Sequence, residues 1–315
     1  MFIGSCAGIF YALDKDSGEK RWAYDIRADG KQTSFHGDPL VDAGIIFVGT
    51  DYSCAPDGIG HLYAFNMADG TLRWKYKSPV GLSTNVVRVG SNAWVGTVMG
   101  DWASVGSRTG RIRVLIPSPL PKGPCDLPKW LATAHDSIVA VGKDNLIYGL
   151  SNRTARVRWK VKLPADPSTS PAVQGNEILV GASDNRVYRM AARDGTIKSS
   201  FPVGGVPVGR PLVAGDVVFF ILDGDDANHG AVTAVGRNGA LWSAELHRKQ
   251  SSEQPYAWND TVVVGDCGGT ITALRADTGT PAWSLKLEGC IRSIGGDKTS
   301  LYVGAQEGTV FAIQR

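Results

Sequence analysis

Short apolar runs recur along this chain and are separated by polar turns that contain glycine. One copy of the pattern runs from Phe2 to Trp22 as FIGSCAGIFYALDKDSGEKRW. The same order of apolar strand, glycine, apolar-aromatic strand, polar turn and Trp returns in Ile45–Trp74, Ile138–Trp159 and Val262–Trp283. The runs are short and rich in Val, Ile and aromatic residues, which is typical of strands rather than helices. The sequence therefore predicts an all-β fold built from one repeated unit.

The polar turns give the period of the repeat. Successive turns lie 40 to 52 residues apart, at Gly18, Gly70, Gly110, Ala155, Gly195, Gly239 and Gly279. A period near 40 with four strand-length segments, named A to D from the inside outward, is typical of a β-propeller blade. Eight pairs of strands B and C can be counted in the sequence. We predict a β-propeller of eight four-stranded antiparallel blades, with seven blades as the alternative.

The two ends of the chain fall within the repeat. The first unit lacks strand A and the last lacks strand D. We expect a single propeller domain over residues 1–315, with terminal blades that are incomplete or closed jointly by N- and C-terminal strands. Because Met1 falls in the middle of a blade, an upstream segment or an unusual closure is expected.

A tryptophan occupies the same position in most units. It is present as Trp22, Trp74, Trp159, Trp242 and Trp283, whereas Val114 and Ser199 replace it in units three and five. A large flat side chain at a fixed blade position can bury much apolar area against the neighbouring blade. We therefore expect these tryptophans to pack between blades rather than to stack on a ligand.

The blade pattern resembles the quinoprotein-type repeat named for pyrroloquinoline quinone (PQQ), with a consensus close to G-x-x-Y-A-L-D-x-x-T-G-x-x-x-W. The segments YALDKDSGEKRW and TALRADTGTPAW are near-verbatim copies, and the match covers essentially the whole chain. The family includes PQQ-dependent alcohol dehydrogenases, BamB-type lipoproteins of outer-membrane assembly and sensor domains of bacterial kinases. The resemblance implies the propeller fold and leaves several functions open.

The dehydrogenases of this family are about twice as long and carry a vicinal Cys-Cys disulfide and a Ca²⁺-binding Glu/Asn set. This chain has 315 residues and no two adjacent cysteines. The resemblance therefore favours a BamB-like scaffold without a cofactor, and PQQ or Ca²⁺ remains the weaker expectation. It also implies a periplasmic or extracellular location. The sequence shows no signal peptide, so a cytoplasmic location stays open.

Composition narrows the classes of partner. The chain has 33 basic and 30 acidic residues, a net charge of +3, and no basic run of the nucleic-acid-binding type. No apolar segment reaches the length of a membrane span. We expect a monomer that binds neither nucleic acid nor the membrane interior.

Five cysteines fall in connections that a propeller places at one rim. Cys6, Cys54 and Cys267 lie in B–C connections, and Cys125 and Cys290 lie in D–A connections. One or two disulfides of an exported protein, free thiols, and a metal-binding or reactive thiol are the alternatives. Because the count is odd, at least one thiol is unpaired within a monomer.

Polar residues before each strand A predict a site in the central funnel. The pair His36 and Asp38 suits acid–base chemistry, with Glu253 as a third catalytic candidate. Arg210 and Arg292 could hold a carboxylate or phosphate through forked hydrogen bonds. The other candidate ligand-binding residues near the funnel are Asn85, Lys129, Trp130 and Gln254. A solvated channel without a ligand is the alternative.

Two B–C loops, Thr50–His61 and Asp223–Gly230, exceed the length that the repeat needs. Long loops on a rigid scaffold are where function is commonly added. The second loop carries four weak candidate Ca²⁺ ligands, Asp223, Asp225, Asp226 and Asn228. An ordinary polar turn is the alternative.

The sequence thus favours a non-catalytic propeller that binds a protein or peptide on its loop rim. Strand addition to an exposed edge is one possible binding mode. The alternative is an enzyme or sensor that binds a small anionic molecule in the central funnel.

Overall fold

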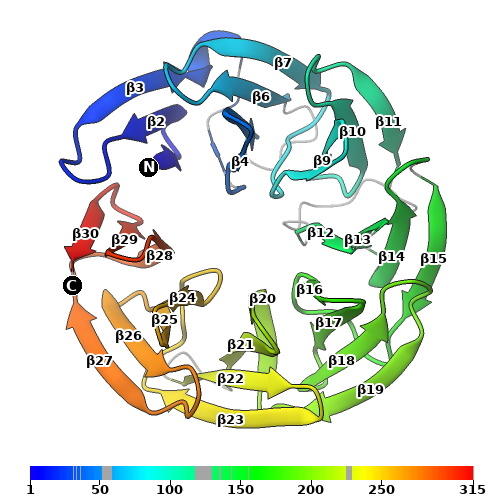
Figure 1. The fold of residues 1–315 in the computed structure, drawn as a ribbon, viewed down its shortest axis with the longest axis vertical. Coiled ribbons are helices and arrows are strands. Elements are labelled where there is room, and N and C mark those ends of the chain that lie inside the picture. The colour runs from blue at the N-terminus through cyan, green and yellow to red at the C-terminus, as the bar shows by residue number, and fades with distance from the viewer. Residues whose placement is uncertain are drawn as a thin grey trace. The chain divides into compact units, whose positions relative to one another are not determined.

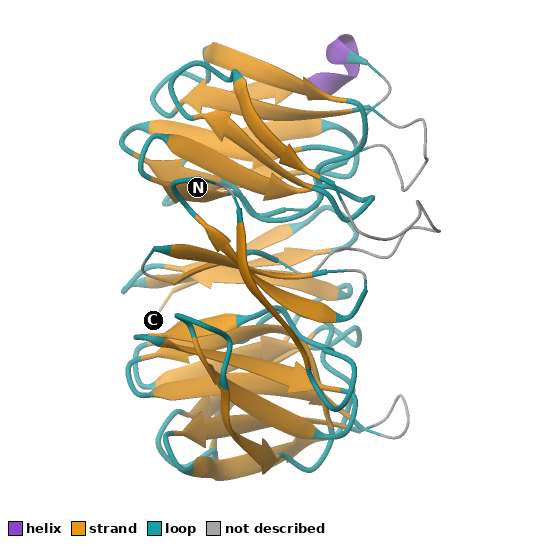
Figure 2. Ribbon diagram, turned by 90° about the vertical axis from the view of Figure 1, so that its right-hand side faces the viewer, coloured by secondary structure: helices purple, strands orange, loops and turns teal. Residues whose placement is uncertain are grey.

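A computed structural model describes residues 1–30, 32, 34, 35, 37–51, 59–117, 130–134, 136–142, 144–154, 156–224 and 229–314. Strands supply nearly all the regular structure of these residues, together with one short 3-10 helix, η1 (Ile26–Asp29) (Figure 2). Asp25 caps η1 by accepting a hydrogen bond from the Arg27 amide. Within the described residues, no helix is long and apolar enough to cross a membrane.

Two compact units divide the chain, Met1–Lys160 and Val161–Arg315. The first unit carries four sheets, the fourth of which ends just beyond Lys160. Sheet 1 contains β1 (Phe2–Gly4), β2 (Ile9–Leu13) and β3 (Lys20–Asp25). Sheet 2 contains β4 (Leu40–Asp42), β5 (Ile45–Gly49), β6 (Gly60–Asn66) and β7 (Leu72–Ser78). Sheet 3 contains β8 (Val87–Val89), β9 (Asn92–Gly96), β10 (Trp102–Gly106) and β11 (Ile112–Ile116). Sheet 4 contains β12 (Ala132–Ala134), β13 (Ser137–Val141), β14 (Leu146–Ser151) and β15 (Val157–Lys162).

The second unit repeats this arrangement with four further sheets. Sheet 5 contains β16 (Ala172–Gln174), β17 (Glu177–Ala182), β18 (Arg186–Ala191) and β19 (Ile197–Pro202). Sheet 6 contains β20 (Val206–Ala214), β21 (Val217–Asp223), β22 (Gly230–Gly236) and β23 (Gly239–Leu246). Sheet 7 contains β24 (Tyr256–Trp258), β25 (Thr261–Gly265), β26 (Thr270–Arg275) and β27 (Pro281–Lys286). Sheet 8 contains β28 (Ile291–Gly296), β29 (Ser300–Ala305) and β30 (Val310–Gln314).

In every sheet the strands pair in chain order, so each is an up-and-down meander of the kind found in propeller blades (Figure 1). Sheets 1 and 8 have three strands in the described residues and the other six have four. The eight sheets confirm the all-β, eight-bladed propeller, and the seven-blade alternative is wrong. The single domain over residues 1–315 and the joint closure of the terminal blades remain predictions.

The loops of each sheet gather at two opposite ends. At one end the B–C loop meets the connection that follows strand D, as in the bonds from the Val203 amide to Asn185 and from the Leu287 amide to Gly269. We call this the BC-loop end. At the other end the C–D turn meets the A–B turn, as in the 2.9 Å bond from the Ala276 amide to the Asp260 carbonyl. We call this the CD-turn end.

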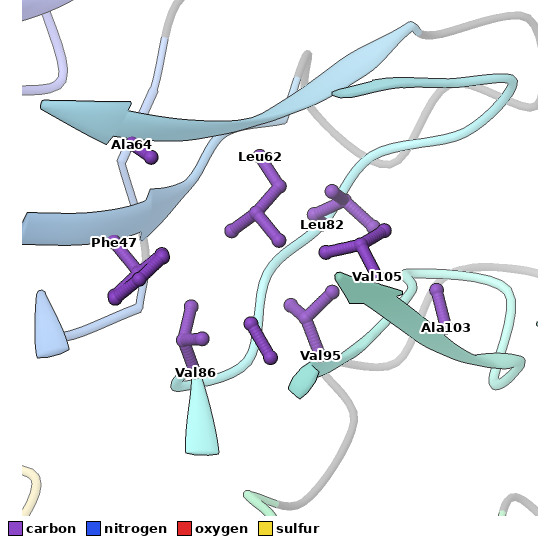
Figure 3. Close-up of a cluster of buried hydrophobic side chains, with 9 residues drawn as sticks. Phe47, Leu62, Ala64, Leu82, Val86, Val95, Ala103 and Val105 are labelled. Carbon is purple, nitrogen blue, oxygen red and sulfur yellow. The ribbon is translucent and has the colours of Figure 1, made fainter. Parts of the chain in front are cut away.

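Alternating apolar residues build the core between neighbouring sheets. Between sheets 2 and 3, side chains from β5 and β6 meet side chains from β9, β10 and the segment that leads into β8 (Figure 3). These residues are fully or almost fully buried: Phe47, Leu62, Ala64, Leu82, Val86, Ala93, Val95, Ala103 and Val105. Because the contact is between sheets, burial of this cluster fixes how one blade packs on the next.

The repeated tryptophan joins three of the blades to the blade that follows. Trp22 and Trp74 donate from Nε1 to carbonyls in the C–D turn of the following sheet, at 3.3 Å and 3.0 Å. Trp242 does the same at 3.1 Å. The acceptors are the carbonyls of Met67, Ser107 and Ala276. The expected packing between blades is confirmed for these three.

The turn glycines are required by the same contact. Gly70, Gly110 and Gly279 have φ of +71°, +65° and +73°, where side chains are disfavoured. A Cβ atom on any of them would lie 2.5–2.6 Å from the indole of the preceding sheet. The recurrence of Trp and Gly in the sequence therefore reflects one interlocking contact.

The other two tryptophans are also packed. Trp283 lies edge-on to Trp258 at a centroid distance of 6.0 Å and packs on the apolar cluster that joins sheets 7 and 8. Trp159 is buried over Gly149 of its own sheet. Both indoles therefore serve the apolar core.

Sheet 5 lacks the tryptophan and uses an arginine instead. Ser199 stands at the tryptophan position, and its cross-strand neighbour is Arg189, which is only 4 % exposed. Arg189 donates to the Gly236 carbonyl in the next sheet at 2.8 Å and pairs with Glu177 at 2.7 Å. The guanidinium thus makes the link to the following turn that an indole makes elsewhere. The sequence showed the missing tryptophan but not its replacement.

Candidate functional site

The polar segments that lead into strand A mostly hold the sheets together. In the first unit, the Asn85 amide donates to the Leu131 carbonyl at 3.0 Å and accepts from the Leu131 amide at 2.9 Å. This pair of bonds joins sheet 3 to sheet 4. Asn85, predicted to bind a ligand, is thus engaged with backbone, while Asp38 is exposed and Trp130 is half-buried. His36 and Lys129 lie outside the described residues.

Hydroxyl groups in these segments have a structural role as well. The Thr84, Thr169 and Ser252 side chains accept hydrogen bonds from the amides of the strand-B glycines Gly96, Gly181 and Gly265, at 2.7, 2.9 and 3.1 Å. The bond recurs in sheets 3, 5 and 7 and anchors the start of strand A to strand B. Polar side chains in these segments therefore stabilise the sheet and do not only face solvent.

Two of the predicted funnel residues converge in the second unit. The Arg210 guanidinium lies 3.6 Å from the Glu253 carboxylate, and the Arg210 amide donates to the Glu253 carbonyl at 2.9 Å. Gly209 belongs to the same contact, since its φ is +69° and a Cβ there would lie 2.4 Å from the Glu253 carbonyl oxygen. Arg210 is mostly buried and Glu253 is mostly exposed. An anion that reached Arg210 would have to compete with this carboxylate.

The remaining candidates of this unit are Arg292 and Gln254. Arg292 is exposed, and its guanidinium forks onto the Gln306 side-chain oxygen at 3.0 and 2.7 Å. Gln254 is half-buried. Ser252 makes the same bond to strand B that Thr84 and Thr169 make in their sheets. The residue after Ser252 is Glu253, which is therefore the equivalent of Asn85, and Gln254 is not. An extra residue between Ser252 and strand β24 shifted the equivalence that the sequence suggested.

The predicted site residues are therefore divided between the two units, and Asn85, Arg210, Glu253 and Arg292 are engaged in local contacts. The acid–base roles of His36, Asp38 and Glu253 and the ligand-binding roles of the other candidates stay predictions.

The cysteines of the last two sheets are joined. Cys267 in the B–C loop of sheet 7 forms a disulfide with Cys290, which precedes β28. The Cys290 amide donates to the Glu307 carboxylate at 3.2 Å, so the B–C loop of sheet 8 is tied to the same point. Cys6 is exposed and carries a free thiol. Cys54 and Cys125 lie outside the described residues.

The proposed cation loop is only partly described. Asp223 pairs with Lys249 at 2.5 Å, which directs its carboxylate to a lysine rather than to a cation. Asp225, Asp226 and Asn228 lie outside the described residues. In the part of the chain that the structure describes, no group of three His, Cys, Asp or Glu side chains is arranged to hold a metal ion.

A buried polar network in the first unit was not foreseen. Tyr24 and Tyr63 donate to the Asp29 carboxylate at 2.8 and 2.9 Å, and Lys75 pairs with the same carboxylate. Gln32 donates to the Tyr63 hydroxyl at 2.9 Å. Burial, together with the bond to Asp29, raises the pKa of Tyr24 to about 12, and the same causes raise the pKa of Tyr63 further. Both tyrosines stay protonated at neutral pH, and through Asp29 they hold η1 to β3 and to β6.

Comparison with known proteins supports one family. A curated outer membrane protein assembly factor BamB from Salmonella typhimurium strain LT2 is 24 % identical over 341 residues, covering 100 % of this chain and 82 % of that protein. The BamB of Moranella endobia strain PCIT is 22 % identical over 339 residues, with 100 % of this chain and 83 % of that protein covered.

Solved structures show the same fold. BamB from Moraxella catarrhalis superposes with a TM-score of 0.79 at 16 % identity, covering 100 % of this chain and 93 % of that one. The computationally designed protein Ika8 gives a TM-score of 0.80 at 15 % identity, covering 100 % of this chain and 92 % of Ika8. The dihydro-heme d1 dehydrogenase NirN gives 0.77 at 13 % identity, covering 99 % of this chain and 70 % of NirN. One of these folds belongs to a dehydrogenase and one to an assembly factor, so the fold alone does not select a function.

The sequence pattern does select a family. The family described as outer membrane protein assembly factor BamB matches residues 1–123, 126–226 and 228–315, which include strands from all eight sheets. The chain belongs to the family of outer membrane protein assembly factor BamB.

Proposed function

We propose that this protein is a non-catalytic scaffold that binds a protein partner of a bacterial outer-membrane assembly machinery. The observation that carries the proposal is the family match across all eight blades. The curated relatives are named as outer membrane protein assembly factors, and their match covers the whole of this chain. A bacterial envelope location follows from the same relatives.

The BC-loop end is the surface that we propose for the partner. The two loops that exceed the repeat length are Thr50–His61 in the first unit and Asp223–Gly230 in the second, and each connects strands B and C of its own sheet. The disulfide between Cys267 and Cys290 ties one B–C loop to a D–A connection there. A rigid sheet framework with elaborated loops at one end suits recognition of a folded partner.

Charged side chains at this end allow the proposal to be tested by substitution. Arg248 and Arg292 are exposed near the disulfide-linked loops of sheets 7 and 8. Exposed cations on a binding surface mainly change the association rate and its salt dependence. Arg193 and Arg237 are exposed in C–D turns at the opposite end and serve as matched controls.

The test is reconstitution with purified components of an outer-membrane assembly machinery, followed by surface plasmon resonance. We expect saturable binding by the protein and a loss of about tenfold or more in the double variant Arg248→Glu/Arg292→Glu. The control variant Arg193→Glu/Arg237→Glu is expected to bind like the wild type. Equal losses in the two variants, or no binding to any component, would refute the proposal.

A cellular assay provides a second measurement. The protein, fused to an export signal, would be expressed in a strain that lacks its own BamB, and the amount of folded outer-membrane barrel protein would be measured. Restoration by the wild type and the control variant, but not by Arg248→Glu/Arg292→Glu, is the expected result. Failure of the exported, folded wild type to restore assembly would count against the proposal.

A further inference from the structure

One rung of side chains recurs across strands B, C and D. In sheet 2 the rung is Phe47, Ala64 and Trp74, which are cross-strand neighbours in register. Sheets 1, 6 and 7 have the same order of an apolar residue, Ala and Trp. The small residue in the middle leaves room for the indole to reach the next blade.

Sheet 3 breaks this order. Its rung is Trp94, Ser104 and Val114, so the bulky ring has moved to strand B and the strand-D position holds a small side chain. In sheet 5 the missing indole is replaced by Arg189, which reaches the next turn. In sheet 3 no side chain of the rung takes that place, since Ser104 and Val114 are both too short to do so.

A cavity of about 280 Å³ lies at the unfilled position. It lies at the CD-turn end, between the A–B turn of sheet 3 and the C–D turn of sheet 4. Its wall is formed mainly by Trp94, Ser104, Val114, Arg113, Asn152 and Arg153. The volume is close to the lower limit of pockets that bind small molecules.

The floor of the cavity carries two buried polar groups. Trp94 and Ser104 are each 1 % exposed, and within the described residues neither Trp94 Nε1 nor Ser104 Oγ has a hydrogen-bond partner. Three of the repeat tryptophans, which lie on strand D, use Nε1 to bind a carbonyl. Each of these two atoms has less than 1 Å² of accessible surface, so they lie beneath the cavity wall and are not offered to a guest.

The mouth of the cavity is cationic. Arg113 and Arg153 are exposed there, and among the described residues neither has a carboxylate within ion-pair distance. The residues that line the cavity include no Asp or Glu. Guanidinium groups bind carboxylates through two parallel bonds, so the mouth favours an anionic group on the guest.

We propose that this cavity binds a small planar aromatic carboxylate, with its ring in the space left by the missing indole and its carboxylate at Arg113 and Arg153. The ring would occupy the position that an indole fills in the other sheets. The cavity lies at the CD-turn end of sheets 3 and 4, away from the B–C loops of those sheets, and its proposal does not depend on the one for the protein partner.

The probe for this site is 4-hydroxybenzoate, a planar aromatic ring that carries one carboxylate. Isothermal titration calorimetry is expected to give saturable binding with a Kd of about 0.1–1 mM, as befits so small a ligand. Phenol and the non-planar 4-hydroxycyclohexanecarboxylate should each bind at least about fivefold more weakly, because the first lacks the carboxylate and the second lacks the planar ring.

Variants locate the binding. Val114→Trp restores the repeat tryptophan and is expected to abolish binding, and Ser104→Leu fills the same space if that variant fails to fold. Arg113→Gln/Arg153→Gln should weaken 4-hydroxybenzoate about tenfold and leave phenol unchanged. Arg108→Gln, an exposed arginine of the β10–β11 turn that does not line the cavity, is the control.

Three results would overturn the proposal. The first is the absence of saturable binding up to 10 mM probe, about ten times the weakest expected Kd. The second is undiminished binding by folded Val114→Trp or Ser104→Leu. The third is a crystal grown with the probe that holds only water in the cavity.

Discussion

The contact between a repeat tryptophan and the turn glycine of the next blade predicts different costs for the same substitution at two glycines. Gly110 and Gly18 both end a C–D turn, with φ of +65° and +73°. A Cβ on Gly110 would lie 2.6 Å from the Trp74 ring, whereas a Cβ on Gly18 meets no atom within 4 Å. Gly110→Ala and Gly18→Ala therefore share the backbone cost and differ only in the contact.

The magnitudes follow from these two terms. A left-handed backbone costs an alanine about 1–2 kcal/mol, which is the whole expected loss for Gly18→Ala. Overpacking against the indole adds about 1–3 kcal/mol for Gly110→Ala. For a chain of 315 residues, an unfolding entropy of about 2.1 cal/mol/K per residue makes 1 kcal/mol equal to roughly 1.5 °C in Tm.

The assay is urea unfolding of both variants, followed by circular dichroism, with Tm from calorimetry as a second measure. Gly110→Ala is expected to lose about 2 kcal/mol more than Gly18→Ala, or roughly 3 °C more in Tm. In a Trp74→Leu background this difference should vanish, because the colliding ring is gone. Losses within about 0.5 kcal/mol of each other, or a difference that persists without the indole, would refute the interlocking contact.

Three further predictions test other parts of the fold. Cys267→Ser opens a disulfide with a sequence separation of 23 residues and is expected to lower the free energy of unfolding by about 3 kcal/mol, measured against the wild type without and with reductant. A hydrogen bond from Lys198 lowers the pKa of Glu177 below 4.5, so the ionised Glu177 stabilises the fold above that pH and this stabilisation is lost as pH falls. Glu177→Gln should flatten this part of the curve of stability against pH. An unchanged curve would contradict the role of Glu177. Arg189→Ala should lower the free energy of unfolding by about 3 kcal/mol. Adding Ser199→Trp should recover part of this loss, because it places a tryptophan at the position that the other sheets use. No recovery in the folded double variant would argue against the equivalence of arginine and tryptophan here.

Much of the architecture was readable from local pattern. The alternation of apolar and polar residues gave the strands, and the spacing of the turns gave eight blades with incomplete first and last sheets. The packing role of the repeated tryptophan was also predictable, because a large ring at a fixed position in most units has few other uses. These features depend on short-range periodicity, which a single sequence contains.

The site residues were harder to place because their roles depend on neighbours in other blades. Asn85 and Arg210 looked like ligand-binding groups, but the first bonds the Leu131 backbone and the second lies beside Glu253. One extra residue before β24 was enough to shift the equivalence from Gln254 to Glu253. A repeat pattern does not reveal such partners, since they come from far along the chain.

The sequence by itself determined the all-β repeat, the number of blades and the positions where the tryptophan is missing. Only the tertiary structure decided what happens at those positions: Arg189 bridges one of them, and a cavity floored by Trp94 and Ser104 remains at the other. The physical reason is that strand order and period are set by each residue's local preference. The filling of a space between two blades depends on side chains that meet only after both blades have folded.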